Sequence, residues 1–117
     1  MAVRPASSDT IAAIATAPGI GGIGIIRISG PQSSAILRRL FKPHHFRTTF
    51  QTHKLYYGTI IDRHGVILDE VLAVFMQAPH TYTREDVVEL HSHGSYLVLQ
   101  AILTEVLAAG ARVADAG

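Results

Sequence analysis

Hydrophobic and polar positions alternate along this 117-residue chain with two different periods. A period of two, rich in β-branched and aromatic side chains, is typical of strands, whereas apolar positions three and four apart are typical of helices. We expect strands over Thr10–Ala17, Ile23–Ile28, His53–Asp62, Val66–Met76 and Val87–Leu90, and a last extended piece over Ala111–Gly117. Arg63-His64-Gly65 reads as a turn, which predicts a hairpin from the third and fourth of these strands.

Two helices are predicted between the strands. The first begins at Ser29-Gly30-Pro31, because proline suits the first helical position, and Pro43 ends it. The second begins at Gly94 or Ser95 and ends near Gly110. Its apolar stripe has helical spacing and consists of Leu99, Ile102, Leu103, Val106 and Leu107. The pattern therefore predicts one α+β domain over residues 1–117, with a mixed or antiparallel sheet and two main helices.

The stretch from Gly19 to Pro31 is the most unusual part of the pattern. Four glycines fall within six positions, and the isoleucines that follow predict a strand buried on both faces. Arg27 lies inside this strand and, since a guanidinium keeps its charge, it needs a protein carboxylate or an anionic ligand. No Lys-Ser or Lys-Thr pair and no helix follows the glycines, so a tight structural turn is favoured over a phosphate-binding loop.

A second informative segment runs from Thr81 to Gly94. Its alternation places one set of side chains on one strand face, namely Glu85, Glu89, His91 and His93. Glu89 is an anion that can pair with Arg27 or accept donors from a ligand lying between the two. Ser92 stands between two histidines, but neighbours on a strand point to opposite faces, so no catalytic residue is predicted.

A metal site is the alternative use of these histidines. His91 and His93 can reach one ion from alternate strand positions, with His53 or His80 as a third ligand. A half-exposed polar strand face is favoured over this arrangement. The loop from His44 to Thr52 is basic and contains histidines, but a solvated connector is favoured there over a phosphate contact.

Composition limits the class of protein. Hydrophobic residues make up 48% of the chain and charged residues 16%, which favours an apolar surface that meets a partner. The net charge of +1 gives no strong electrostatic case for nucleic acid. The chain has no cysteine, and Met1–Asp9 does not have the pattern of a signal peptide. No apolar run approaches the length of a membrane helix, so we expect a cytoplasmic protein.

Two long motifs resemble those of one protein family. The run from Asp9 to Gly30 is similar to the opening of the MnmE (TrmE) family of tRNA modification GTPases. The run from Tyr82 to Gly94 resembles the second signature of that family, and the order and spacing of the two agree. The resemblance covers essentially the whole chain.

The resemblance implies that this chain is the first domain of a longer GTPase, before a helical domain and a G domain. It implies a fold like the tetrahydrofolate-binding domains of glycine-cleavage aminomethyltransferases, a homodimer, and a bound one-carbon folate with 5-formyl-tetrahydrofolate as analogue. The one-carbon unit of the folate would be used to modify the wobble uridine of tRNA. A flavoprotein of the MnmG (GidA) family would be the partner in this modification. GTP, Mg²⁺ and K⁺ would bind outside this chain, which has no GTPase motif.

The folate contacts of the family fall on Arg27 and Glu89, and a third contact, a lysine, lies beyond the end of this chain. Further positions expected to line the pocket are Gly21, Gly22, Ile23, Tyr82 and His91. The chain departs from the family pattern at Ile20, Arg84, Ser92 and Ser95, which concern the rim of the pocket. Besides folate binding, three alternatives stay open: a dimerisation scaffold with a structural Arg27–Glu89 pair, the histidine metal site, and direct RNA binding.

Overall fold

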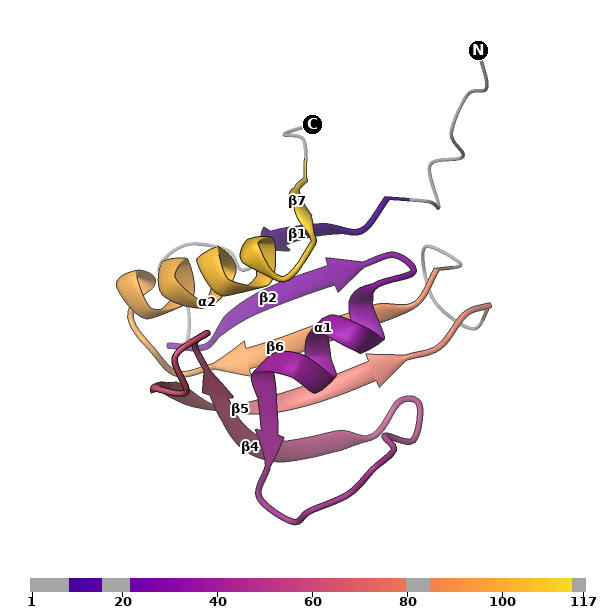
Figure 1. The fold of residues 1–117 in the computed structure, drawn as a ribbon, viewed down its shortest axis with the longest axis horizontal. Helices are drawn as coiled ribbons and strands as arrows, with labels where there is room; N and C mark the ends of the chain where they lie inside the picture. The colour runs from indigo at the N-terminus through magenta and orange to yellow at the C-terminus, as the bar shows by residue number, and fades with distance from the viewer. Residues whose placement is uncertain (1–8, 16–21, 80–84, 115–117) are drawn as a thin grey trace.

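The computed structural model describes residues 9–15, 22–79 and 85–114 and has a mixed α+β architecture (Figure 1). Within these residues, seven strands form one sheet in the order β3-β4-β5-β6-β2-β1-β7. The strands are β1 (Ile11–Ile14), β2 (Gly24–Ser29), β3 (Phe41–Pro43), β4 (Leu55–Ile61), β5 (Ile67–Met76), β6 (Val87–Ser92) and β7 (Arg112–Val113). Helices α1 (Ser33–Leu40) and α2 (Tyr96–Ala108) complete the fold. The α+β class, the two helices and the β4–β5 hairpin are confirmed.

The register of the strands divides the sheet into two faces. Strands β4, β5, β6, β2 and β1 pair antiparallel, and β7 lies parallel beyond β1. Residues paired directly across neighbouring strands project to the same face. The pairing therefore produces one row of side chains across the sheet, namely Ala13, Arg27, Glu89, Val74 and Leu55. We call the face that carries this row the open face, because α1 and α2 pack on the other side.

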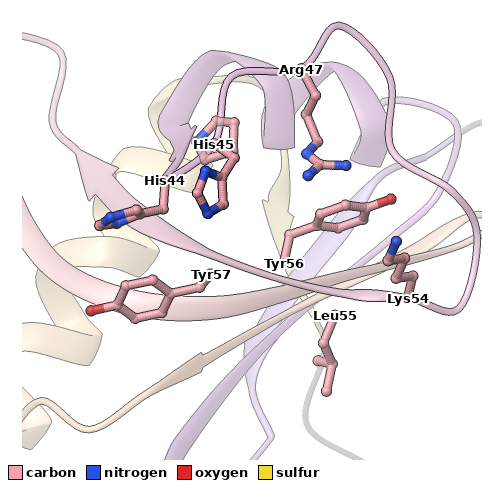
Figure 2. A pocket seen from close by; sticks show the side chains of 8 residues that line it. His44, His45, Arg47, Lys54, Leu55, Tyr56 and Tyr57 are labelled. Carbon is pink, nitrogen blue, oxygen red and sulfur yellow. The ribbon is translucent and has the colours of Figure 1, made fainter.

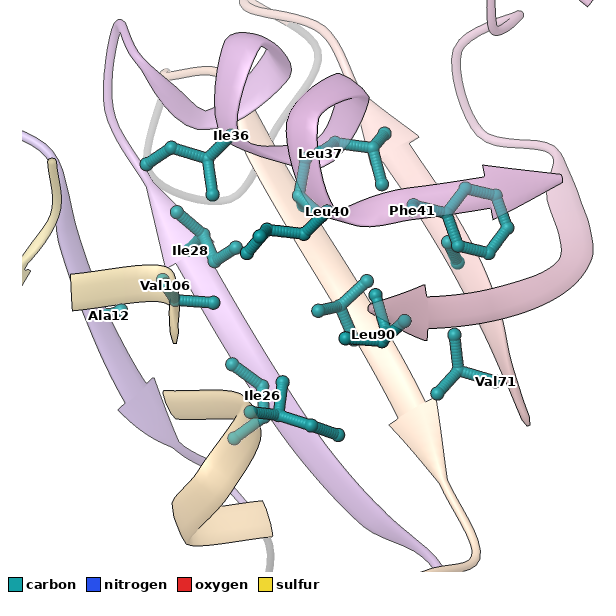
Figure 3. Packing of buried hydrophobic residues seen from close by; sticks show 14 of the residues in the cluster. Ala12, Ile26, Ile28, Ile36, Leu37, Leu40, Phe41, Val71, Leu90 and Val106 are labelled. Carbon is teal, nitrogen blue, oxygen red and sulfur yellow. The ribbon is translucent and has the colours of Figure 1, made fainter. Parts of the chain in front are cut away.

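The covered face holds the hydrophobic core. Strand residues from β2, β5 and β6 meet apolar side chains of both helices there (Figure 3). The central members are Ile26, Ile28, Val71, Leu90, Ile36, Leu37, Leu40, Ile102 and Val106. Burial of one such side chain contributes about 1.5–3 kcal/mol, so this face supplies most of the stabilisation.

Helix α1 starts two residues later than the sequence pattern predicts. The backbone N–H of Gln32, the residue just before the helix, donates to Thr10 Oγ1 at 2.8 Å, so a residue next to the first strand fixes the turn that precedes α1. Gly30 has a φ of +134°, and a Cβ there would lie 2.5 Å from the carbonyl oxygen of Asp9. This close approach holds Pro31 in the turn before Ser33, and the expectation of proline at the first helical position is wrong.

Three other expectations need correction. Helix α1 ends at Leu40 rather than at Pro43, because the chain turns directly into β3, a strand that the pattern did not indicate. Strand β1 ends at Ile14, and the last residues of its predicted range lie outside the described residues. Strand β2 is not buried on both faces, since Arg27 is exposed on the open face.

Helix α2 matches its prediction at both ends. The hydroxyl oxygen of Ser95 accepts the backbone N–H of Val98, as expected of an N-cap, and Gly110 has a φ of +127° just after the helix. Of the two helices in the described part of the chain, neither is long and apolar enough to cross a membrane.

Candidate functional site

Arg27 and Glu89 lie opposite each other on the open face, on adjacent strands β2 and β6. Arg27 Nη2 is 2.8 Å from Glu89 Oε2, and Arg27 Nε donates to the same oxygen at 2.9 Å. The arginine that seemed isolated in the sequence therefore has a protein carboxylate as its partner. The Arg27 side chain is 48% exposed and that of Glu89 16%, so the guanidinium remains accessible from solvent.

His91 is the third member of this group. It lies two residues after Glu89 on the same face, and its Nε2 is 2.9 Å from Glu89 Oε1. Burial of Glu89 disfavours its charged form, but hydrogen bonds from His91 and Arg27 and the charge of Arg27 outweigh this, so the pKa of the Glu89 carboxyl is lowered. The site therefore presents an ionised carboxylate between an arginine and a histidine.

Apolar side chains surround the three polar ones on the open face. Ala13 and Val74 flank Arg27 and Glu89 in the same row, and Ile25 and Leu72 flank His91 in the next. Leu72 is 37% exposed. A few convergent polar groups within an apolar surface are typical of a site for a small organic ligand.

The other residues that were predicted to line the folate pocket differ in where the structure places them. Ile23 is 42% exposed and precedes β2, two residues from Ile25 and therefore next to the His91 end of the site. Gly22 has a φ of +72°, which explains a glycine there as a turn residue. Gly21 and Tyr82 lie outside the described residues.

Gly24 has a structural role that the sequence did not reveal. A Cβ on Gly24 would lie 2.3 Å from Leu99 Cδ1, so the glycine lets α2 pack closely on β2. The interpretation as a tight structural turn agrees with the structure for Gly22, whereas Gly24 is the first residue of strand β2.

The proposed metal ligands are not brought together among the described residues. No group of three or more histidine, aspartate, glutamate or cysteine side chains there could hold a metal ion. His91 contacts Glu89, and His53 lies in the loop before β4, where its N–H donates to Phe75. His80, the other suggested ligand, falls outside the described residues.

Comparison with known proteins places this chain in a family. A family model described as "GTP-binding protein TrmE N-terminus" matches residues 10–117. The chain belongs to this family. A tRNA modification GTPase MnmE of Desulfotalea psychrophila is 51% identical over 117 residues, which are 100% of this chain and 25% of that protein. A protein of the same name from Syntrophobacter fumaroxidans is 56% identical over 110 residues, 93% of this chain and 23% of its own length. The chain spans about a quarter of the length of these curated relatives.

One polar pair of this TrmE N-terminal domain escaped the sequence analysis. Ser92 is fully buried on the covered face, donates its hydroxyl to Asp69 Oδ2 and accepts the N–H of Gly94 at 3.0 Å. Alternation along β6 correctly placed Ser92 on the opposite face from His91. Its partner lies 23 residues earlier on β5, which only the β5–β6 register brings next to it.

Proposed function

We propose that this TrmE N-terminal domain binds a one-carbon tetrahydrofolate at Arg27 and Glu89 and forms a homodimer within a tRNA modification GTPase. The observation that carries the proposal is the ionised Glu89 carboxylate, held between Arg27 and His91 on an uncovered, largely apolar sheet face. An exposed ion pair contributes only about 0–1 kcal/mol to stability, so stability alone is a weak reason for these charges.

The chemistry of the carboxylate fits a pterin-like ring. Such a ring presents adjacent N–H donors, and a carboxylate accepts paired donors in one plane. Glu89 Oε2 already accepts a hydrogen bond from Arg27 Nε and lies 2.8 Å from Arg27 Nη2, whereas Oε1 has one contact, with His91. A ligand would therefore bind through Oε1, in place of His91 or beside it, and Arg27 would contact its carbonyl or carboxylate oxygens.

The open face also supports the homodimer. Ile25, Leu72 and Val74 leave apolar surface exposed or half-buried around the charged group. A second copy of the domain would cover this surface and exclude water from a ligand at Glu89. In this proposal the nearest functional analogue is the folate-binding domain of the aminomethyltransferases. GTP, Mg²⁺ and K⁺ bind elsewhere in the longer protein. Its partners are tRNA and a flavoprotein of the MnmG type.

The observed ion pair also favours a second candidate, the dimerisation scaffold with a structural Arg27–Glu89 pair. In that case both charges are already satisfied and no ligand is required. The two candidates differ in what added folate does, because only a folate-binding domain is stabilised by the ligand.

Calorimetric titration of the chain with 5-formyl-tetrahydrofolate tests the proposal. We expect one ligand per subunit for the wild type, loss of binding in Glu89→Ala, and at least tenfold weaker binding in Arg27→Ala. Arg38→Ala, which removes an exposed arginine from α1, serves as the matched control and should bind normally. Sedimentation of the same samples reports the dimer. A folded wild-type chain that dimerises but releases no heat would support the scaffold instead.

A further inference from the structure

A second group of charged side chains lies at the β4 edge of the sheet, away from Arg27 and Glu89. The register of β3 with β4 covers only Gly58–Ile60, so the start of β4 borders the loop that connects the two strands. Loop and strand enclose an open pocket of about 210 Å³ (Figure 2). Its lining residues are Pro43, His44, His45, Arg47, Lys54, Leu55, Tyr56 and Tyr57.

Two cations of this pocket converge on one aromatic ring. Arg47 Cζ lies 4.5 Å from the centroid of the Tyr56 ring, and Lys54 Nζ lies 5.7 Å from it (Figure 2). The ring attracts each cation, but the two positive charges repel each other. The pocket lining contains no carboxylate, and the ion pairs between described residues include neither Arg47 nor Lys54. Arg47 Nε is also buried without a hydrogen-bond partner among the described residues.

The Tyr56 ring is a fixed platform for these cations. Tyr56 is 5% exposed, packs edge-on against Phe50 with centroids 5.0 Å apart, and accepts the backbone N–H of Gln51 at 2.8 Å. The end of the loop is equally fixed, because His53 has a φ of +62° and its N–H donates to the carbonyl of Phe75 at 2.7 Å. The backbone between Arg47 and Lys54 is therefore held at Gln51 and His53 before any ligand arrives.

Flat rings continue along the mouth of the pocket. Tyr57 is 45% exposed, donates its hydroxyl to Glu70 of β5 and lies with its ring centroid 5.4 Å from that of His44. The same strand connects this region to the first site, because Leu55 pairs with Val74, which pairs with Glu89. Two strand spacings, roughly 10 Å, separate the backbones of Leu55 and Glu89.

We propose that this pocket binds a phosphate group in the backbone of an RNA strand. A phosphate supplies the negative charge that Arg47 and Lys54 lack, and its oxygens match the fork of the guanidinium. Cations together with an exposed aromatic ring are a combination that recognises single-stranded nucleic acid. Here Arg47 and Lys54 lie over the buried ring of Tyr56, and the exposed ring of the neighbouring residue Tyr57 would stack with a base. The choice of RNA rests on the proposed role in tRNA modification, whereas the phosphate site rests on the pocket alone. The chain's low net charge hides this local concentration of cations.

Fluorescence anisotropy with a labelled single-stranded RNA of about twelve nucleotides tests the proposal. Arg47→Gln and Lys54→Gln should each weaken RNA binding about tenfold. Each should also make the dependence of RNA affinity on salt concentration shallower, by the amount that corresponds to the loss of about one phosphate contact. Arg38→Gln removes the same charge from the exposed surface of α1 and should change binding less than twofold. Lys54 is exposed, so Lys54→Gln remains informative if Arg47→Gln disturbs the fold.

Three results would overturn the proposal. If the affinity for RNA is unchanged in both Arg47→Gln and Lys54→Gln, the pocket is not an RNA-binding site. If Arg38→Gln weakens RNA binding as much as they do, the effect is one of nonspecific charge. Chemical shifts at Lys54 that respond to inorganic phosphate but not to RNA would identify a free phosphate as the ligand. Failure here is separable from failure of the folate proposal, because Arg47→Gln should leave the heat of folate binding unchanged.

Discussion

The two faces of the sheet use the same strands for different purposes. In β6, Leu90 is 1% exposed within the core, whereas the preceding residue, Glu89, lies on the open face in contact with Arg27 and His91. In β2, Arg27 follows Ile26, which is fully buried on the covered face. Because neighbouring strand residues point to opposite sides, adjacent positions separate the stabilisation of the fold from the chemistry of the site.

The largest expected effect is the difference in stability between a substitution on the covered face and the same substitution on the open face. Leu90→Ala should lower the free energy of unfolding by about 2–5 kcal/mol, because it leaves a cavity among packed side chains. Leu72→Ala makes the same chemical change on the open face and should cost less than about 1 kcal/mol. Denaturant unfolding of both variants at low protein concentration measures the difference.

The Leu72→Ala variant also tests whether the two faces really differ in solution. If Leu72→Ala destabilises the chain as much as Leu90→Ala does, the open face is covered in solution. Repeating the unfolding over a range of protein concentrations then shows whether a second copy covers it, because only a dimer has concentration-dependent stability.

A smaller effect is expected at the polar residue of the covered face. Ser92→Ala removes the hydroxyl that contacts Asp69 and Gly94, and should cost about 1–3 kcal/mol because it leaves partly buried polar groups unpaired. Ser95→Ala, which removes the exposed cap of α2, should cost only about 0.5–1 kcal/mol. The same loss in both variants, measured by thermal unfolding, would mean that water replaces the Ser92 contact.

Local patterns predicted much of the fold because they act over short distances. Alternation located the β4–β5 hairpin, and helical spacing with Ser95 and Gly110 located α2. The errors occurred where distant residues decide. Thr10 binds the N–H of Gln32, just before α1, from 22 positions away. Strand β3 forms because Phe41–Pro43 pairs with β4, which no local pattern indicates.

The residues of the candidate site were predictable from the sequence, and the Arg27–Glu89 pair was one of the alternatives that the sequence left open. The charge of Arg27 inside an apolar strand and the alternation around Glu89 singled out both residues, but their direct pairing depends on the β2–β6 register. The Arg47–Tyr56–Lys54 group was missed because the loop between β3 and β4 looks like a solvated connector in sequence. Only its folded path places Arg47 and Lys54 over the same ring.

The smallest effect concerns the open-face ion pair and its dependence on pH. Since the folded state lowers the pKa of Glu89 below its ordinary value of 4.5, this carboxylate stabilises the fold above about pH 4.5. The contribution declines as the pH falls through the lowered pKa. Glu89→Gln should therefore lose less than about 1 kcal/mol at pH 7, and the difference from wild type should shrink in acid. Arg27→Gln should weaken the same pH dependence, because it removes one of the groups that lower this pKa. Unfolding measured between pH 3 and pH 7 tests both, and a Glu89→Gln difference that grows in acid would show that the ion pair does not stabilise the charged carboxylate.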